Sequence, residues 1–221
     1  MTAIKTIAIA MVLSVWGGTP ADAASSWRDK VTAFAAENFK NPAWGFSHCQ
    51  RDYRLAREMA AADHVTLDDD VLFAAAYLHD MAAFDPWAEK KKEHGDVAAE
   101  KIDLVLADTD FPKVKLDAVR AAIRTHMFNY TPVGPEARYL HDADDLDWMG
   151  AIGIARMLPL ADKKGGKPST ADMIKGIQAG LAAERNGIVT PAGKARMPGR
   201  IAEGKAFMDA LARESADFSE L

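Results

Sequence analysis

Apolar residues recur along most of this chain at the spacing of amphipathic α-helices, and short polar segments rich in Gly, Pro or Asp separate the runs. Residues three and four positions apart share one face of a helix, whereas a half-buried strand alternates apolar and polar residues. The chain contains no convincing run of the second kind. The pattern therefore predicts an all-α fold.

The helices predicted from this periodicity are separated by breaks at Asn41-Pro42 and at Thr131-Pro132. The expected helices cover residues 26–39, 47–62, 69–81, 93–106, 115–126, 136–157, 169–183 and 199–213. Residues 163–168 (KKGGKP) form the most linker-like segment, and residues 193–199 are interpreted as a polar turn. We expect a helical bundle with a helical extension at its C-terminal end.

Residues 1–23 stand apart because they are typical of a secretory signal peptide. Lys5 precedes a short apolar stretch at 7–16, and Ala21-Asp22-Ala23 fits the small-residue cleavage pattern. The stretch is shorter than the about 20 residues that a membrane-spanning helix needs, although a retained N-terminal anchor is the alternative. We expect cleavage after Ala23 and a periplasmic or secreted protein without stable membrane insertion. Residues 24–221 would then form a single domain.

The composition of the chain limits the kinds of ligand that we expect it to bind. With 49% hydrophobic and 27% charged residues the chain is ordinary for a globular domain. A net charge of -5 provides no basic field for a nucleic-acid duplex, so a small molecule is the expected partner. Cys49 is the one cysteine, which excludes an internal disulfide and a cysteine-based zinc site. Any metal must be held by His, Asp or Glu. The sequence does not indicate an oligomeric state.

Histidine and aspartate residues stand at the ends of several predicted helices. His48 opens one helix, and His79-Asp80 closes a strongly apolar one. Both side chains of that pair are costly to bury unless something compensates them, and a divalent cation would do so. His48 and one acidic residue from the run at 141–147 would complete a site of imidazole and carboxylate ligands. Such a site suits Mn²⁺, Mg²⁺, Fe²⁺, Co²⁺, Ni²⁺ or Zn²⁺.

Two further histidines have two interpretations. His94 begins one predicted helix and His126 ends another. They could bind a second ion with Asp80 as the bridge, or they could contact substrate directly as hydrogen-bond donors. Paired metals about 3.5 to 4 Å apart stabilise both the entering and the leaving oxygen in a displacement at phosphorus. The number of ions, one or two, stays open at this point.

These motifs, taken in order, resemble the HD superfamily of metal-dependent phosphohydrolases. The likeness extends over about residues 44–157, and its last segment is similar to the DADxLDxxGAIGIAR-like segment of one bacterial branch. The matching stretches are His48-Cys-Gln-Arg51, the Ala-Ala-Tyr-Leu-His79-Asp80 box, the helix that ends at His126, and residues 142–156. Each motif is weak alone, but the ordered set is specific.

The resemblance implies a ligand set. In the H…HD…D order of the superfamily, the metal ligands are His48, His79, Asp80 and Asp144. Asp142 is the alternative acidic ligand, but residues two positions apart point to nearly opposite sides of a helix. We therefore expect only one of these two aspartates to bind the ion. This branch commonly has Arg after Ala-Asp, whereas this chain has an aspartate at position 145, which removes a positive charge near the site.

The resemblance also implies hydrolysis of a small phosphate ester or nucleotide. The metal would lower the pKa of bound water from about 15.7 toward neutrality and polarise a phosphoryl oxygen. Asp80 would orient the attacking water, and Arg51 with His94 or His126 would steady the developing charge. The alternative is a non-catalytic metal- or ligand-binding HD protein, and redox chemistry at a di-iron site is a minor option.

Some neighbouring residues have plainer interpretations. Lys90, Lys91 and Lys92 could form a lid over a phosphate, but a run of lysines is more often a solvated surface patch. Arg156 is as compatible with a structural ion pair as with a substrate contact. Phe128 is expected in the core or in a pocket wall rather than in a base-stacking platform.

Overall fold

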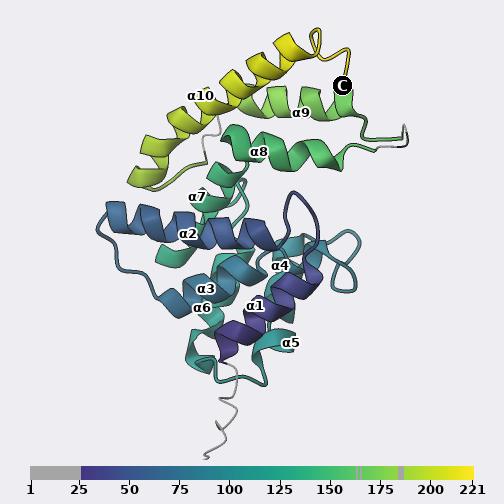
Figure 1. Ribbon diagram of the computed structural model, residues 1–221. Helices are drawn as coiled ribbons and strands as arrows, with labels where there is room; N and C mark the ends of the chain where they lie inside the picture. Colours follow the sequence, from purple (N-terminus) through teal and green to yellow (C-terminus); the bar gives the residue numbers. More distant parts are fainter. Residues whose placement is uncertain (1–25, 163, 165, 184–186) are drawn as a thin grey trace, which may run out of the picture.

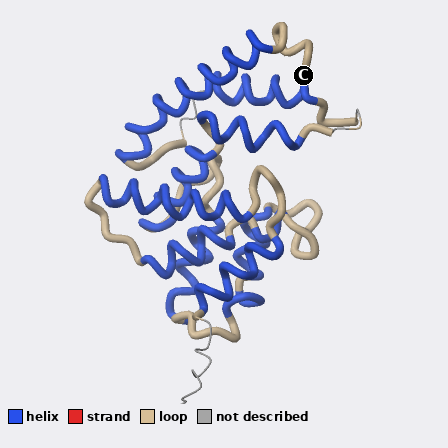
Figure 2. The backbone as a smooth tube through the Cα atoms, in the orientation of Figure 1, coloured by secondary structure: helices blue, strands red, loops and turns tan. Residues whose placement is uncertain are grey.

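The computed structural model describes residues 26–162, 164, 166–183 and 187–221. The expected signal peptide and its cleavage site lie outside these ranges. The described residues form helices joined by turns, with no strand among them, which confirms the predicted all-α fold (Figure 2). None of these helices is both long and apolar enough to span a bilayer.

The helices fall into two groups, α1 to α6 and α8 to α10, and α7 passes between them (Figure 1). In chain order the α-helices are α1 (Trp27–Asn38), α2 (Phe46–Ala62), α3 (Asp69–Leu78), α4 (His94–Lys101), α5 (Asp103–Leu106), α6 (Leu116–Arg124), α7 (Pro135–Asp147), α8 (Gly150–Met157), α9 (Thr170–Ala182) and α10 (Pro191–Glu214). Short 3₁₀ turns η1 (Met81–Ala83), η2 (Lys113–Lys115) and η3 (Leu158–Leu160) lie between them.

Helix α3 lies at the centre of the first group. Every residue from Val71 to Leu78 is buried, and α1, α2, α6 and α7 all pack against this helix. Its three consecutive alanines, Ala74, Ala75 and Ala76, have small side chains that let neighbouring helices approach closely. Burial on all sides holds the end of α3 firmly, and His79 and Asp80 follow directly after it.

Three predicted helices are shorter than expected. The helix predicted for residues 136–157 is divided into α7 and α8, because Gly150 has φ +74, a left-handed conformation that a continuous right-handed helix does not contain. The helix predicted for 69–81 ends at Leu78, which places Asp80 in a turn before η1. The helix predicted for 93–106 is divided at Ile102 into α4 and α5.

The polar turn predicted for residues 193–199 is wrong, because these residues lie inside α10. The Thr190 side chain accepts the backbone N–H of Gly193, and Pro191 occupies the first helical position, where its missing N–H costs nothing. Helix α10 therefore begins at Pro191, eight residues before the predicted start at position 199. Helix α10 then packs along α8 and α7.

Candidate metal centre

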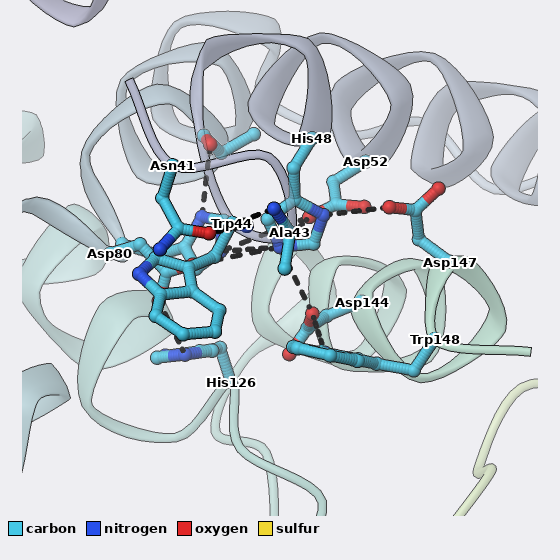
Figure 3. A network of polar contacts seen from close by, with 12 residues as sticks. Asn41, Ala43, Trp44, His48, Asp52, Asp80, His126, Asp144, Asp147 and Trp148 are labelled. Carbon is cyan, nitrogen blue, oxygen red and sulfur yellow. Dashed lines mark hydrogen bonds and ion pairs between the residues drawn. The ribbon is translucent and has the colours of Figure 1, made fainter. Parts of the chain in front are cut away.

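Histidine and aspartate side chains from the start of α2, the end of α3 and from α7 converge in one buried cluster. His48 lies in the first turn of α2, His79 caps α3, Asp80 follows it, and Asp144 lies on α7. All four are buried. Figure 3 shows His48 in the middle of this network, with Asp144 and Asp147 approaching from α7. The structure thus brings together the four residues expected to hold a metal.

The donor atoms of these residues are spaced like ligands of one ion. His48 Nε2 lies 3.4 Å from His79 Nε2, 3.2 Å from Asp144 Oδ1 and 3.6 Å from Asp80 Oδ2. His79 Nε2 lies 3.3 Å from the same Asp80 oxygen. Metal bonds of about 2.0 to 2.2 Å place neighbouring ligand atoms roughly 3.0 to 3.6 Å apart, in tetrahedral or octahedral geometry. The residues present therefore fit a divalent ion.

The orientation of the imidazole rings supports the same conclusion. The Nδ1 atom of His79 lies 2.9 Å from the Ala76 carbonyl oxygen, and that of His126 lies 2.6 Å from the Ile123 carbonyl oxygen. A carbonyl only accepts hydrogen bonds, so both Nδ1 atoms carry the proton and donate it. In the neutral rings Nε2 then presents a lone pair to the cluster, which is the usual state of a metal-binding histidine.

Asp80 joins this group to a second one through its other oxygen. Asp80 Oδ1 lies 3.2 Å from His94 Nε2 and 3.9 Å from His126 Nε2, and the two imidazole nitrogens are 3.4 Å apart. Its Oδ2 atom faces His48 and His79. One carboxylate therefore has an oxygen in each of two donor groups, as the bridging arrangement expected from the sequence requires.

Asp147 holds His48 from the side away from the cluster. Its Oδ2 atom accepts the Nδ1–H of His48 at 2.8 Å, and its two oxygens also accept Nε and Nη2 of Arg51 at 2.6 and 2.9 Å. These contacts fix the ring and leave Nε2 for the cluster. The guanidinium of Arg51 is therefore placed behind His48. This corrects the expectation that it faces the substrate.

Arg156 forms a structural ion pair. Its Nη1 atom lies 3.0 Å from Asp147 Oδ2 and also donates to the backbone carbonyl of Ala43. The guanidinium stacks on the Trp148 ring at 3.9 Å, and the indole Nε1–H of Trp148 donates to Asp144 Oδ1 at 3.0 Å. Of the two interpretations of Arg156, the structure favours the ion pair that ties α8 to α7.

Asp142 lies on the opposite face of α7 from Asp144. Its carboxylate accepts the backbone N–H groups of Val189 and Thr190, at 3.0 and 2.7 Å, and the Thr190 hydroxyl at 2.6 Å. His141 Nδ1 is a further neighbour at 2.9 Å. These donors satisfy the Asp142 carboxylate far from the histidine cluster. Of Asp142 and Asp144, it is thus Asp144 whose carboxylate lies next to Nε2 of His48.

Burial and the charges of neighbouring residues shift the pKa values of the side chains in the cluster. Burial lowers the pKa of His79, but the charge of Asp80 outweighs burial and raises that pKa to about 9. Burial raises the pKa of Asp144, but hydrogen bonding and charge from His48 outweigh it and hold that pKa well below its usual range. Burial and the charge on His79 lower the pKa of His126 to about 4. A protonated His79 thus compensates the carboxylate of Asp80 where no cation is present.

Sequence reasoning missed one residue of this cluster, Asp52. It lies on α2 one turn after His48, is fully buried, and its Oδ2 atom is 3.2 Å from His48 Nε2. The available signal was spacing, because residues four apart share a helix face. Asp147 of the acidic run was not singled out from the sequence either, yet it is fully buried.

The cluster opens into a pocket of about 400 Å³. Its polar edge consists of Asp80, Asp144 and His94, and no lysine or arginine is among the described residues that line it. The remaining lining residues are Trp44, Ala83, Met127, Phe128, Trp148 and Met157. The Trp44 and Trp148 rings lie 6.4 Å apart between centroids, and both border the network in Figure 3. The expected position of Phe128 in a pocket wall is confirmed.

Lys90, Lys91 and Lys92 are exposed, and Lys92 pairs with Glu89 at 2.8 Å. None of the three lines the pocket. The lysine run is therefore a surface segment in this structure, in agreement with its plainer interpretation.

Known proteins resemble this chain in sequence and in fold. The HD domain family model matches residues 45–149. No curated protein matches the chain. A predicted HD superfamily hydrolase from an uncultured Thermotogales bacterium has a similar fold, with TM-score 0.59 and 23% identity over 85% of this chain and 90% of that one.

Two other solved structures are also similar. A protein from Lactobacillus plantarum has TM-score 0.58 and 23% identity over 85% of this chain and 96% of that one. Bacillus subtilis YpgQ, solved in complex with ADP, has TM-score 0.59 and 19% identity over 85% of this chain and 97% of that one. The family match spans the motifs from His48 to Asp147 and identifies residues 45–149 as an HD domain, and the solved structures share the fold of this chain.

Proposed function

We propose that this protein is a metal-dependent phosphohydrolase that acts on a small phosphate ester or nucleotide. The observation that carries the proposal is the pair of donor groups that share Asp80 at the edge of an open pocket. Sequence similarity to the HD family supports the metal dependence. The predicted hydrolase from the Thermotogales bacterium and the ADP complex of YpgQ support hydrolysis and a nucleotide-like substrate.

Two ions fit the donor sets of this chain. His48, His79, Asp144 and Oδ2 of Asp80 would hold the first ion. His94, His126 and Oδ1 of Asp80 would hold the second. When bound, a divalent ion lowers the pKa of water and acts as a Lewis acid toward a phosphoryl oxygen. Mixed imidazole and carboxylate ligation is compatible with Mn²⁺, Mg²⁺, Fe²⁺, Co²⁺, Ni²⁺ and Zn²⁺.

The pocket lining supports a role for metal in phosphate binding. Asp80 and Asp144 would repel a phosphate group, and no basic lysine or arginine among the described lining residues offsets them. We therefore expect phosphate to bind at this edge when cations neutralise the carboxylates. Among the described lining residues, His94 has a partly exposed imidazole that can also donate a proton to a phosphate or a leaving oxygen.

The pocket walls suit a flat substrate group. Trp44, Trp148 and Phe128 present aromatic surface beside the acidic edge. The volume of about 400 Å³ lies within the range of about 300 to 1,000 Å³ that is typical of small-molecule sites. A nucleobase or another planar group would pack against Trp44 or Trp148 while its phosphate reaches Asp80 and Asp144, with Phe128 as part of the surrounding wall. We place this activity in the periplasm or outside the cell, on the strength of the N-terminal sequence.

The test is elemental analysis of the purified mature protein, followed by phosphate release from nucleotides and phosphomonoesters with Mn²⁺, Mg²⁺, Co²⁺ or Zn²⁺ added. We expect one or two metal equivalents and turnover that His79→Ala abolishes. Asp117→Asn on α6 is the matched control, because Asp117 is almost fully exposed and outside the cluster. Bound metal without turnover on any ester would favour the non-catalytic metal-binding alternative, and no metal at all would refute both.

A further inference from the structure

Asp52 is a buried carboxylate with no hydrogen-bond donor. Neither of its oxygens has a hydrogen-bond partner, and the side chain is 0% exposed. A buried carboxylate left without a partner is strongly destabilising, so proteins normally pair it or give it a cation. The guanidinium groups of Arg51 and Arg156 both contact Asp147 instead.

The position of Asp52 matches that of a ligand. Its Oδ2 atom lies 3.2 Å from His48 Nε2 and 3.8 Å from His79 Nε2. Donor atoms of His48, Asp52, His79 and Asp144 all lie within 4.8 Å of one another. Figure 3 shows the Asp52 carboxylate beside the His48 ring, directed into the network. The H…HD…D order does not include this residue.

We infer that Asp52 is a further protein ligand of the first ion, together with His48, His79, Asp80 and Asp144. The inference rests on the metal-binding part of the proposed function. Two imidazole nitrogens and three carboxylate oxygens would make an oxygen-rich set of donors. Oxygen-rich sets of this kind suit Mn²⁺, whereas Zn²⁺ is held well by four ligands.

The test measures binding of Mn²⁺ and Zn²⁺ by calorimetry to the wild-type protein, Asp52→Asn and Asp117→Asn. Asp117→Asn makes the same change of charge at an exposed position. Asp52→Asn should weaken Mn²⁺ binding at least about tenfold and Zn²⁺ binding less, because Zn²⁺ keeps four ligands. Wild-type affinity for Mn²⁺ in Asp52→Asn would overturn the inference.

A second measurement does not depend on whether the variant folds. In crystals of the wild-type protein grown with Mn²⁺, anomalous scattering locates the ion. A bond of about 2.0 to 2.3 Å from the ion to Asp52 Oδ2 is expected, and an ion bound by the other four residues with Asp52 well beyond bonding distance would overturn the inference. If the protein binds Mn²⁺ through Asp52 but hydrolyses no ester, the inference stands and the hydrolase proposal fails.

Discussion

The two faces of α7 bury aspartates in different ways. On one face, Asp142 receives backbone N–H groups and a hydroxyl from residues 189 and 190. On the other, Asp144 faces other carboxylates and the Nε2 atoms of histidines. A buried carboxylate that is fully hydrogen-bonded stabilises a fold, whereas a group of carboxylates that share too few donors needs a cation. The first face of α7 therefore serves the architecture and the second serves the site.

The largest expected difference comes from removing one aspartate from each face. Asp144→Ala should weaken metal binding by more than about 100-fold and abolish turnover, because it removes a ligand at the pocket edge. Asp142→Ala should keep most of both, but should lower the free energy of unfolding by about 2 to 4 kcal/mol, because buried donors lose their acceptor. Calorimetry with Mn²⁺ and urea denaturation measure the two effects. Equal losses of metal from both folded variants would show that the two faces do not differ in function.

The distinction between the two faces was partly accessible from the sequence. The order of His48, His79-Asp80 and Asp144 identified the histidine cluster, because each residue lies at a helix end or in a recognisable motif. That Asp142 and Asp144 diverge followed from helix geometry alone. The clamp on Asp142 could not be predicted, because its donors lie 47 and 48 residues away and depend on how the loop before α10 packs.

Other parts of the site depend on packing that no local pattern encodes. Arg51 shares a helix face with His48, as expected, but its guanidinium contacts Asp147 because α2 packs along α7. The burial of Asp52 has the same origin. The predicted helix over 136–157 failed at Gly150, because a glycine in a helical pattern does not reveal its φ. The fold class was thus predictable, but the side-chain partners were not.

The second largest difference between the two faces of α7 is expected when the metal is removed. We expect a chelator to lower the Tm of the wild-type protein and of Asp142→Ala by similar amounts, because both retain the cluster. An ion present at about 100 times its Kd stabilises a folded protein by about 2.7 kcal/mol. Asp144→Ala should show little of this shift. Differential scanning calorimetry with and without chelator makes the measurement, and a full chelator effect in Asp144→Ala would place the ion elsewhere.

Arg51 provides a smaller test of how the site face is held in position. Arg51→Met removes the guanidinium that pairs with Asp147 and should weaken metal binding about 10- to 100-fold, because the ring of His48 loses its indirect support. The guanidinium does not line the pocket, so KM at saturating metal should change little while kcat falls. Arg51→Lys, which keeps the charge but loses the bidentate contact, should be intermediate. A rise in KM alone would instead indicate that Arg51 contacts substrate.

The smallest effect is expected at the lysine run, which lies on neither face of α7. Replacing Lys90, Lys91 and Lys92 with alanine should leave kcat/KM within about twofold, because exposed charges are screened by salt and none of these side chains lines the pocket. Steady-state kinetics at two salt concentrations measure this. A fall of more than about tenfold that disappears at high salt would mean that the lysines guide an anionic substrate toward the carboxylate-rich pocket. In that case the positive charge missing from the lining would be supplied from the surface, and the metals would carry less of the phosphate binding.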